Sequence, residues 1–286
     1  MKQLLVLVGR NGVQGVTTGR VIIIGAGPGV ADLITVRGAR LLAQAEVVLF
    51  DALTDTSLRE LAPNAEWIHV GKRGFCDSTG QTAINALLVR HASAGKCVVR
   101  LKGGDPSVFG RLEEELQALA DAGIACEVVP GVTAAIAAAA ATQRPLTRRG
   151  SGRSVSLTTA MTRERSLHAG RSADTEVFYM AGKQLAALAR RLLAAGWSDE
   201  TPASVVSRAG WPDQLHSEHT VATLGHAAML HAGRPTVVTI GAGATAIVGT
   251  PAATMTDAAA GTPIPSVAPT PAASVESPVA TDDDTA

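Results

Sequence analysis

The chain has 286 residues, enough for two domains, and only 3% of them are aromatic against 46% hydrophobic, so its core must be built from Ala, Val, Leu and Ile. The first 250 residues carry 25 basic against 20 acidic side chains. This mild positive charge suits a small anionic ligand and excludes the strong basic stripe of a nucleic-acid-binding protein.

Strands and helices alternate along the first half of the chain. The pattern predicts strands at 21–24, 47–50, 67–70, 97–101 and 125–129, with helices at 33–45, 82–94, 111–121 and 133–141. Strands that alternate with helices of 10–15 residues predict a mostly parallel sheet with right-handed crossovers.

The second half repeats the α/β pattern after a change in composition. Residues 145–152 are rich in Pro, Arg, Gly and Ser and predict a hinge. Strands are then predicted at 154–158, 176–180, 203–207 and 236–240, and a helix at 183–195. We therefore expect an extension over 1–19, α/β domains over 20–148 and 149–249, and a disordered tail over 250–286, where Ala, Pro, Thr and Ser dominate.

Cysteine, histidine and apolar patterns bear on compartment and metal content. Cys76, Cys97 and Cys126 are odd in number and lack metal-ligand spacing, which predicts reduced thiols. The seven histidines are scattered, so we expect no bound metal. No apolar stretch approaches the length of a membrane span. The sequence therefore predicts a cytoplasmic protein with neither a membrane nor a nucleic-acid partner.

Two glycine turns follow predicted strands, at 25–29 and at 103–106. Such a turn at the carboxyl end of a buried parallel strand is where an α/β sheet holds its ligand. The first turn imitates a dinucleotide-binding fingerprint. That fingerprint requires a small residue at position 30, where this chain has Val30. Pro28 also removes an N–H group that a pyrophosphate would use. A nicotinamide or flavin cofactor therefore stays only as a distant alternative.

Residues 21–241 taken together resemble the tetrapyrrole methylase family. The segments that carry the resemblance are 25–29, 49–51, 70–73, 98–111, 129–134, 145–147, 177–180 and 212–214. The first turn is common to many enzymes of this fold that use S-adenosylmethionine. The combination of 71–73 with 100–106 is more specific, and points to the branch that acts on uroporphyrinogen III.

The resemblance implies an architecture and a reaction. The architecture is two α/β domains, with a mostly parallel sheet in the first, a mixed sheet in the second and the ligand cleft between them. S-adenosylmethionine would bind in the cleft of a homodimer. The implied reaction transfers methyl groups to two pyrrole rings of uroporphyrinogen III and gives precorrin-2, for sirohaem and cobalamin synthesis.

The resemblance also assigns site residues. The chemistry needs a pyrrole carbon aligned with a methyl group and a base that removes a proton. Matching positions for catalysis are Asp51 as proton acceptor, Lys72 as proton donor, and Arg111. Those for the cofactor are Pro28, Gly103, Gly104, Asp105, Val108, Thr133, Ala134, Met180 and Ala209. Those for the substrate carboxylates and pyrrole N–H groups are Arg111, Glu114 and Arg149.

Ordinary structural roles compete with several of these assignments. Asp51 and Thr133 also suit the cap of a helix or turn, and Met180 also suits a position in the core. Lys72 also suits a clamp on a substrate carboxylate or a solvated position on the surface. Arg111 and Glu114 have the spacing of an intrahelical ion pair.

Departures from the family pattern keep other functions open. They lie at Val30, Ser107, Leu112, Glu113 and Ala209, and across 76–81. The alternatives are a methylase of a later corrin intermediate, or a non-catalytic sensor that binds S-adenosylmethionine or a tetrapyrrole.

Overall fold

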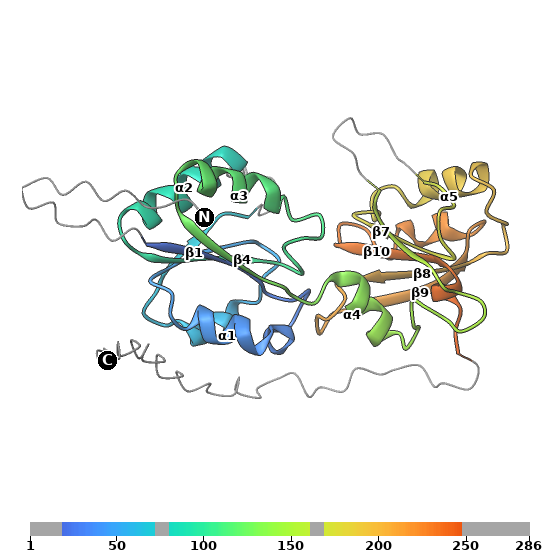
Figure 1. Cartoon of the computed structure of the whole chain (residues 1–286). Coiled ribbons are helices and arrows are strands. Elements are labelled where there is room, and N and C mark those ends of the chain that lie inside the picture. Colours follow the sequence, from blue (N-terminus) through green and yellow to red (C-terminus); the bar gives the residue numbers. More distant parts are fainter. Residues whose placement is uncertain (1–18, 72–79, 161–168, 248–286) are drawn as a thin grey trace, which may run out of the picture.

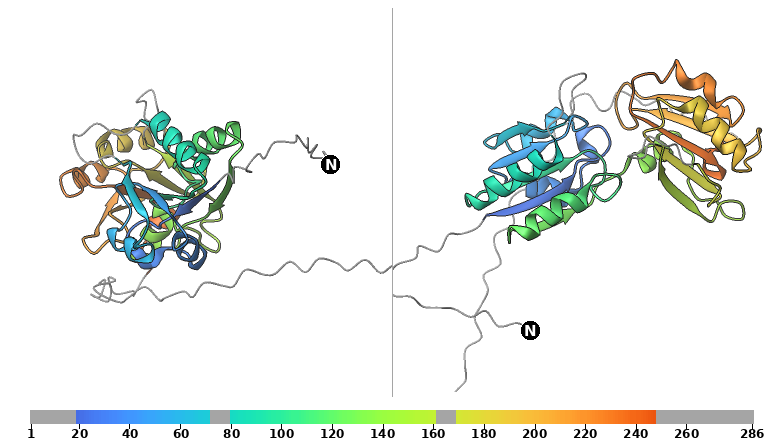
Figure 2. Two further views of the ribbon diagram at one scale, coloured as in Figure 1. Left: turned by 90° about the vertical axis from the view of Figure 1, so that its left-hand side faces the viewer. Right: turned by 90° about the horizontal axis from the view of Figure 1, so that it is seen from above.

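The structure is a computed structural model, and it describes residues 19–71, 80–160 and 169–247. These residues form two lobes that lie side by side, each built on a five-stranded sheet (Figure 1). The view from above shows the same two lobes and the chain that passes between them (Figure 2). Lys72, Cys76, residues 1–18 of the extension expected over 1–19, and the tail expected over 250–286 lie outside the described residues.

The first sheet is wholly parallel. Its strands are β1 (Arg20–Gly25), β2 (Val47–Phe50), β3 (Glu66–His69), β4 (Cys97–Lys102) and β5 (Ala125–Val129), in the order β3-β2-β4-β1-β5. Because side chains alternate along a strand, β1 serves two cores. Ile22 and Ile24 face the side of α1 (Val36–Leu42), and Val21 and Ile23 face α2 (Gln81–Ser93) and α3 (Leu112–Asp121). Helices therefore cover both faces of this sheet (Figure 1).

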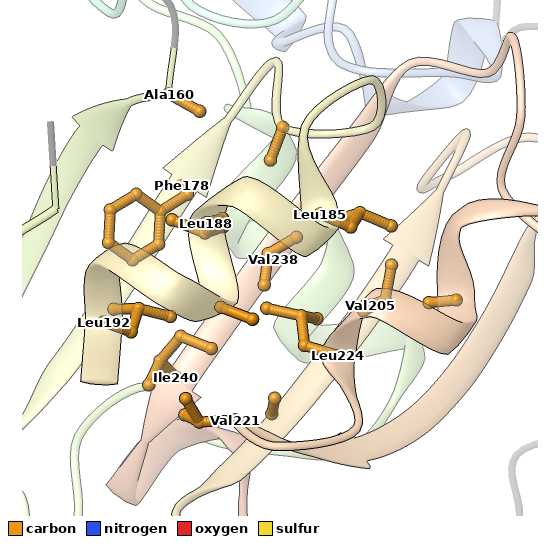
Figure 3. Packing of buried hydrophobic residues seen from close by; sticks show 14 of the residues in the cluster. Ala160, Phe178, Leu185, Leu188, Leu192, Val205, Val221, Leu224, Val238 and Ile240 are labelled. Carbon is orange, nitrogen blue, oxygen red and sulfur yellow. The ribbon is translucent and has the colours of Figure 1, made fainter. Parts of the chain in front are cut away.

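The second sheet is mixed. Its strands are β6 (Val155–Thr159), β7 (Thr175–Tyr179), β8 (Pro202–Ser207), β9 (Leu215–Thr220) and β10 (Thr236–Gly241), in the order β6-β7-β10-β8-β9. Only β6 and β7 pair in parallel. One face packs against α5 (Leu185–Ala194), where Phe178, Leu188 and Val238 are fully buried (Figure 3). The predicted fold class, with a parallel first sheet and a mixed second one, is confirmed.

Helix α4 (Ala134–Ala141) covers the other face of the second sheet. Its Ala135 and Ala138 are buried against Val177 and Val237. The helix nevertheless follows directly on β5 of the first sheet, so the chain crosses between the lobes immediately before α4. The proposed domain limit at 148 comes after this helix in sequence.

Two elements show the main differences from the sequence prediction. The helix expected over 33–45 is divided into a 3₁₀ turn at Ala31–Leu33 and α1, because Thr35 is extended and its hydroxyl accepts the Gly38 N–H at 3.0 Å. Strand β9 was not predicted. None of the helices among the described residues has the length and apolar character needed to cross a membrane.

Candidate functional site

The two predicted glycine turns meet because β1 and β4 are parallel neighbours. Gly104 donates its N–H to the carbonyl oxygen of Gly27 at 2.7 Å, and Gly27 donates back to Gly104 at 3.3 Å. A Cβ atom on Gly25 would lie 2.6 Å from the Cα of Gly131. Glycines are therefore required here for three backbone segments to pack on one another.

The outer part of the first turn contacts the second lobe. A Cβ atom on Gly29 would overlap the carbonyl oxygen of Gly210, which also accepts the N–H of Val30 at 3.0 Å. The indole Nε1 of Trp211 donates to the carbonyl oxygen of Pro28. This turn packs against the protein's own backbone. Gly25 and Gly29 therefore allow close contacts within the protein.

A cavity of about 210 Å³ lies between the lobes and is mainly apolar. All nine residues predicted to contact the cofactor line it: Pro28, Gly103, Gly104, Asp105, Val108, Thr133, Ala134, Met180 and Ala209. The sequence analysis missed several further lining residues, among them Leu53, Phe109, Tyr179, Arg208 and Trp211. We call this the first cavity.

Thr133 and Tyr179 form the polar corner of the first cavity. Their hydroxyl groups lie 2.8 Å apart, and Ala135 donates its backbone N–H to the Tyr179 hydroxyl at 3.3 Å. Burial raises the pKa of Tyr179, so the phenol stays protonated. Thr133 is the N-cap residue of α4, but its side chain makes no capping hydrogen bond. Met180 has an exposed fraction of 51%, which excludes a plain core role.

Asp105 organises the second glycine turn. One carboxylate oxygen accepts the N–H of Ser107 and the other accepts the N–H of Gly131, both at 2.8 Å. The carboxylate thereby joins the turn after β4 to the loop after β5. Asp105 also lines the first cavity, where its remaining lone pairs can accept further hydrogen bonds.

Unusual backbone conformations gather around the cavities. Phe109, Met180 and Arg208 line the first cavity with φ values of 53°, 57° and 50°, and Arg111 lines a second cavity with φ 56°. The only other non-glycine residue with positive φ in the described ranges is Gln143. Left-handed backbone disfavours L-residues and is retained mainly where surrounding structure enforces it.

The second cavity, of about 560 Å³, adjoins the first at the carboxyl ends of β2, β3 and β4. Its charged lining residues are Asp51, Arg100, Lys102 and Arg111. It shares Leu53, Gly103, Val108 and Phe109 with the first cavity. Lys72 follows the lining residue Gly71 but lies outside the described residues.

Asp51 is the outer end of a buried charge network. Arg100 Nη2 contacts Asp51 Oδ1 at 2.6 Å, and Arg100 Nε contacts Glu115 Oε1 at 2.9 Å. Lys102 Nζ also contacts Glu115, at 2.9 Å. Two cations thus balance two carboxylates. The Asp51 side chain is 29% exposed, whereas that of Glu115 is fully buried.

The network shifts the pKa values of its cations in opposite directions. Burial opposes the charge of Arg100, but Asp51 and Glu115 outweigh it and raise the arginine pKa. For Lys102, burial and then the charge of Arg100 lower the pKa despite the contact with Glu115. The guanidinium is therefore the permanent charge beside Asp51.

The structure places the predicted substrate residues in different surroundings. Arg111 lines the second cavity, and its guanidinium binds Glu114 through two hydrogen bonds of 2.7 Å, so the alternative of an ion pair is realised. This bond raises the pKa of Arg111. Arg149 is exposed and lines neither of the two cavities. Within the described ranges, no group of three or more His, Cys, Asp or Glu side chains is placed to hold a metal.

Comparison with known proteins identifies the family. Residues 20–225 match the model of the Tetrapyrrole (Corrin/Porphyrin) Methylases. The uroporphyrinogen-III C-methyltransferase of Pseudomonas aeruginosa is 42% identical over 233 residues, which cover 78% of this chain and 94% of that protein. Siroheme synthase 1 of Pectobacterium atrosepticum is 44% identical over 231 residues, and these cover 78% of this chain but only 48% of that protein.

A solved structure extends the agreement to three dimensions. It is the uroporphyrin-III C-methyl transferase of Thermus thermophilus complexed with S-adenyl homocysteine, with a TM-score of 0.68 and 35% identity over 78% of this chain and 97% of that one. The match in sequence covers both lobes, and so does the match in fold. The chain therefore belongs to the tetrapyrrole methylases.

Proposed function

We propose that this chain transfers methyl groups from S-adenosylmethionine to two pyrrole rings of uroporphyrinogen III and gives precorrin-2, for sirohaem and cobalamin synthesis. One observation carries the proposal. An apolar cavity lined by all nine predicted cofactor contacts adjoins a charged cavity lined by Asp51 and Arg111. The names of the similar proteins point to the same substrate and donor.

The first cavity fits S-adenosylmethionine. Gly104 lines it with φ +73°, and a Cβ atom built on this glycine would meet no atom closer than the Thr133 Cα at 4.0 Å. The side chain of any larger residue at this position would therefore occupy space in the cavity. The apolar lining suits an adenosine, and the backbone of the second glycine turn with Asp105 and Thr133 supplies hydrogen-bonding groups. When bound, the cofactor supplies an electrophilic methyl group on a positively charged sulfur.

Asp51 is placed to accept the proton that the methylated ring must release. One of its oxygens is held by Arg100, and the side chain lines the second cavity. The guanidinium fixes the direction of the carboxylate, which a general base requires. Arg111 would bind a substrate carboxylate by exchanging it for Glu114, its present partner. Lys72 as proton donor and Arg149 as substrate contact stay predictions.

The test is a methyl-transfer assay with uroporphyrinogen III and methyl-labelled S-adenosylmethionine. We expect label in the tetrapyrrole and the absorbance change of the product. The Asp51→Asn and Arg111→Ala variants should keep cofactor affinity and lose turnover. Cofactor binding without transfer to any tetrapyrrole would favour the sensor, and transfer only to a later corrin would favour the related methylase.

We also propose that the protein is a cytoplasmic homodimer, as the family resemblance implies. Light scattering on the purified full chain tests the assembly. A measured mass equal to that of one chain at micromolar concentration would contradict the homodimer. It would leave the proposed reaction unaffected.

A further inference from the structure

Phe109 lies on the wall between the two cavities. Four residues line both cavities, namely Leu53, Gly103, Val108 and Phe109. A methyl group that passes from a donor in the first cavity to an acceptor in the second must cross where these residues lie. The reacting sulfur therefore belongs beside this wall.

The ring of Phe109 is held in place while part of it stays open. Its backbone has φ 53°, and the adjoining Gly110 packs so tightly on the Pro106 carbonyl that a Cβ atom would overlap it. The Phe109 ring centroid lies 5.0 Å from that of Tyr179, whose hydroxyl group is fixed by Thr133 and Ala135. Phe109 nevertheless has an exposed fraction of 42%.

The other aromatic side chains of the site are occupied elsewhere. Tyr179 lines only the first cavity, and its hydroxyl group is already bonded. Trp211 also lines only the first cavity, donates to Pro28 and carries the guanidinium of Arg208 at 4.3 Å over its ring. Among the described residues, Phe109 is the one aromatic side chain that lines both cavities.

We propose that Phe109 recognises the positive sulfonium of the methyl donor through its ring face, and so distinguishes the charged donor from the neutral thioether that remains after transfer. An aromatic ring attracts a cation placed over its face and gives a neutral sulfur no such charge-dependent attraction. The inference rests on the proposed function and adds to it a device for product release.

The experiment compares the affinities of S-adenosylmethionine and S-adenosylhomocysteine for the full chain by isothermal titration calorimetry. The variants are Phe109→Leu, Phe109→Tyr and, as a matched apolar control on the same wall, Leu53→Ala. We expect Phe109→Leu to weaken binding of the charged donor selectively, by about three- to tenfold, and Phe109→Tyr to preserve the wild-type ratio of the two affinities. Leu53→Ala should change both affinities alike.

The ratio of affinities separates the possible outcomes. Equal weakening of both ligands in Phe109→Leu would overturn the inference, since stacking on adenine or a general loss of structure changes both alike. Loss of the wild-type ratio in Phe109→Tyr would also overturn it, because the tyrosine keeps the ring. A wild-type chain that binds neither ligand would overturn the proposed function itself.

Discussion

The indole Nε1 of Trp211 donates a 2.8 Å hydrogen bond to the carbonyl oxygen of Pro28. This bond joins the turn after β1 to the loop after β8, so it fixes the two walls of the first cavity relative to each other. The contact of Gly29 with Gly210 lies beside it. The first glycine turn therefore acts on a ligand mainly by setting the spacing between the lobes.

We expect Gly29→Ala to weaken S-adenosylmethionine binding roughly tenfold, equivalent to about 1.4 kcal/mol, because the added methyl group must push the Gly210 carbonyl away. Calorimetric titration measures the effect. The matched control is Gly170→Ala, where a Cβ atom has no neighbour within 4 Å and affinity should stay unchanged. Wild-type affinity in Gly29→Ala would contradict the role assigned to the lobe contact.

Asp105→Ala should weaken cofactor binding more than Asp105→Asn. Alanine releases the N–H groups of both Ser107 and Gly131, whereas the asparagine oxygen can still accept one of them. The second glycine turn would then lose its fixed shape. Affinities for S-adenosylmethionine that are the same in all three proteins would remove Asp105 from the site.

Glu115→Gln and Asp51→Asn should separate stability from turnover. Loss of the Glu115 charge leaves Arg100 and Lys102 buried with only Asp51 between them, and should lower the free energy of unfolding by roughly 3–5 kcal/mol. Asp51 is partly exposed and an asparagine oxygen there can still accept from Arg100, so Asp51→Asn should lose less stability than Glu115→Gln but lose methyl transfer. Urea titration and the transfer assay, run on both variants, give the comparison. Equal losses of stability in the two would argue against this division.

His231 should make stability depend on acid. The side chain is fully buried, with Ser207 at Nδ1 and Ser217 at Nε2, and burial together with the neighbouring His219 lowers its pKa to about 4. Between pH 6.5 and 4, His231 takes up a proton in the unfolded chain but stays largely neutral in the folded one. The folded state should therefore lose about 3 kcal/mol relative to pH 7 by pH 4, and the loss levels off below that.

The matched variant for this effect is His231→Gln. Its free energy of unfolding, followed by urea titration at several pH values, should fall less steeply than that of the wild type between pH 6.5 and 4. Parallel curves for the two proteins would show that other groups carry the acid sensitivity.

The sequence predicted the first cavity well for a physical reason. Strand order in a parallel sheet brings the loops after β1 and β4 together, and a glycine turn marks where each strand ends. Residues such as Thr133 and Met180 came from the family resemblance, and the fold places them on the same cavity. Their role in binding stays a prediction until a ligand is tested.

Other features carry no local signal. Strand β9 has the sequence Leu-His-Ser-Glu-His-Thr, which lacks an apolar run and forms because it pairs with β8 at the sheet edge. Glu115 stands among two other glutamates at the start of α3, a pattern typical of a solvated helix face. Its burial depends on the charges of Arg100 and Lys102, which come from β4. Arg149 matched a motif, but it lines neither of the two cavities.

Helix α4 has a consequence for how a ligand could enter. Its first residue, Ala134, lines the first cavity together with Thr133. Its buried alanines belong to the core of the second lobe. Because α4 stays packed on the second sheet, pulling the lobes apart would strain the short link between β5 and α4 and break the hydrogen bond from Trp211 to Pro28. We therefore expect the first cavity to be formed before any ligand binds, and ligands to enter without a separation of the two lobes.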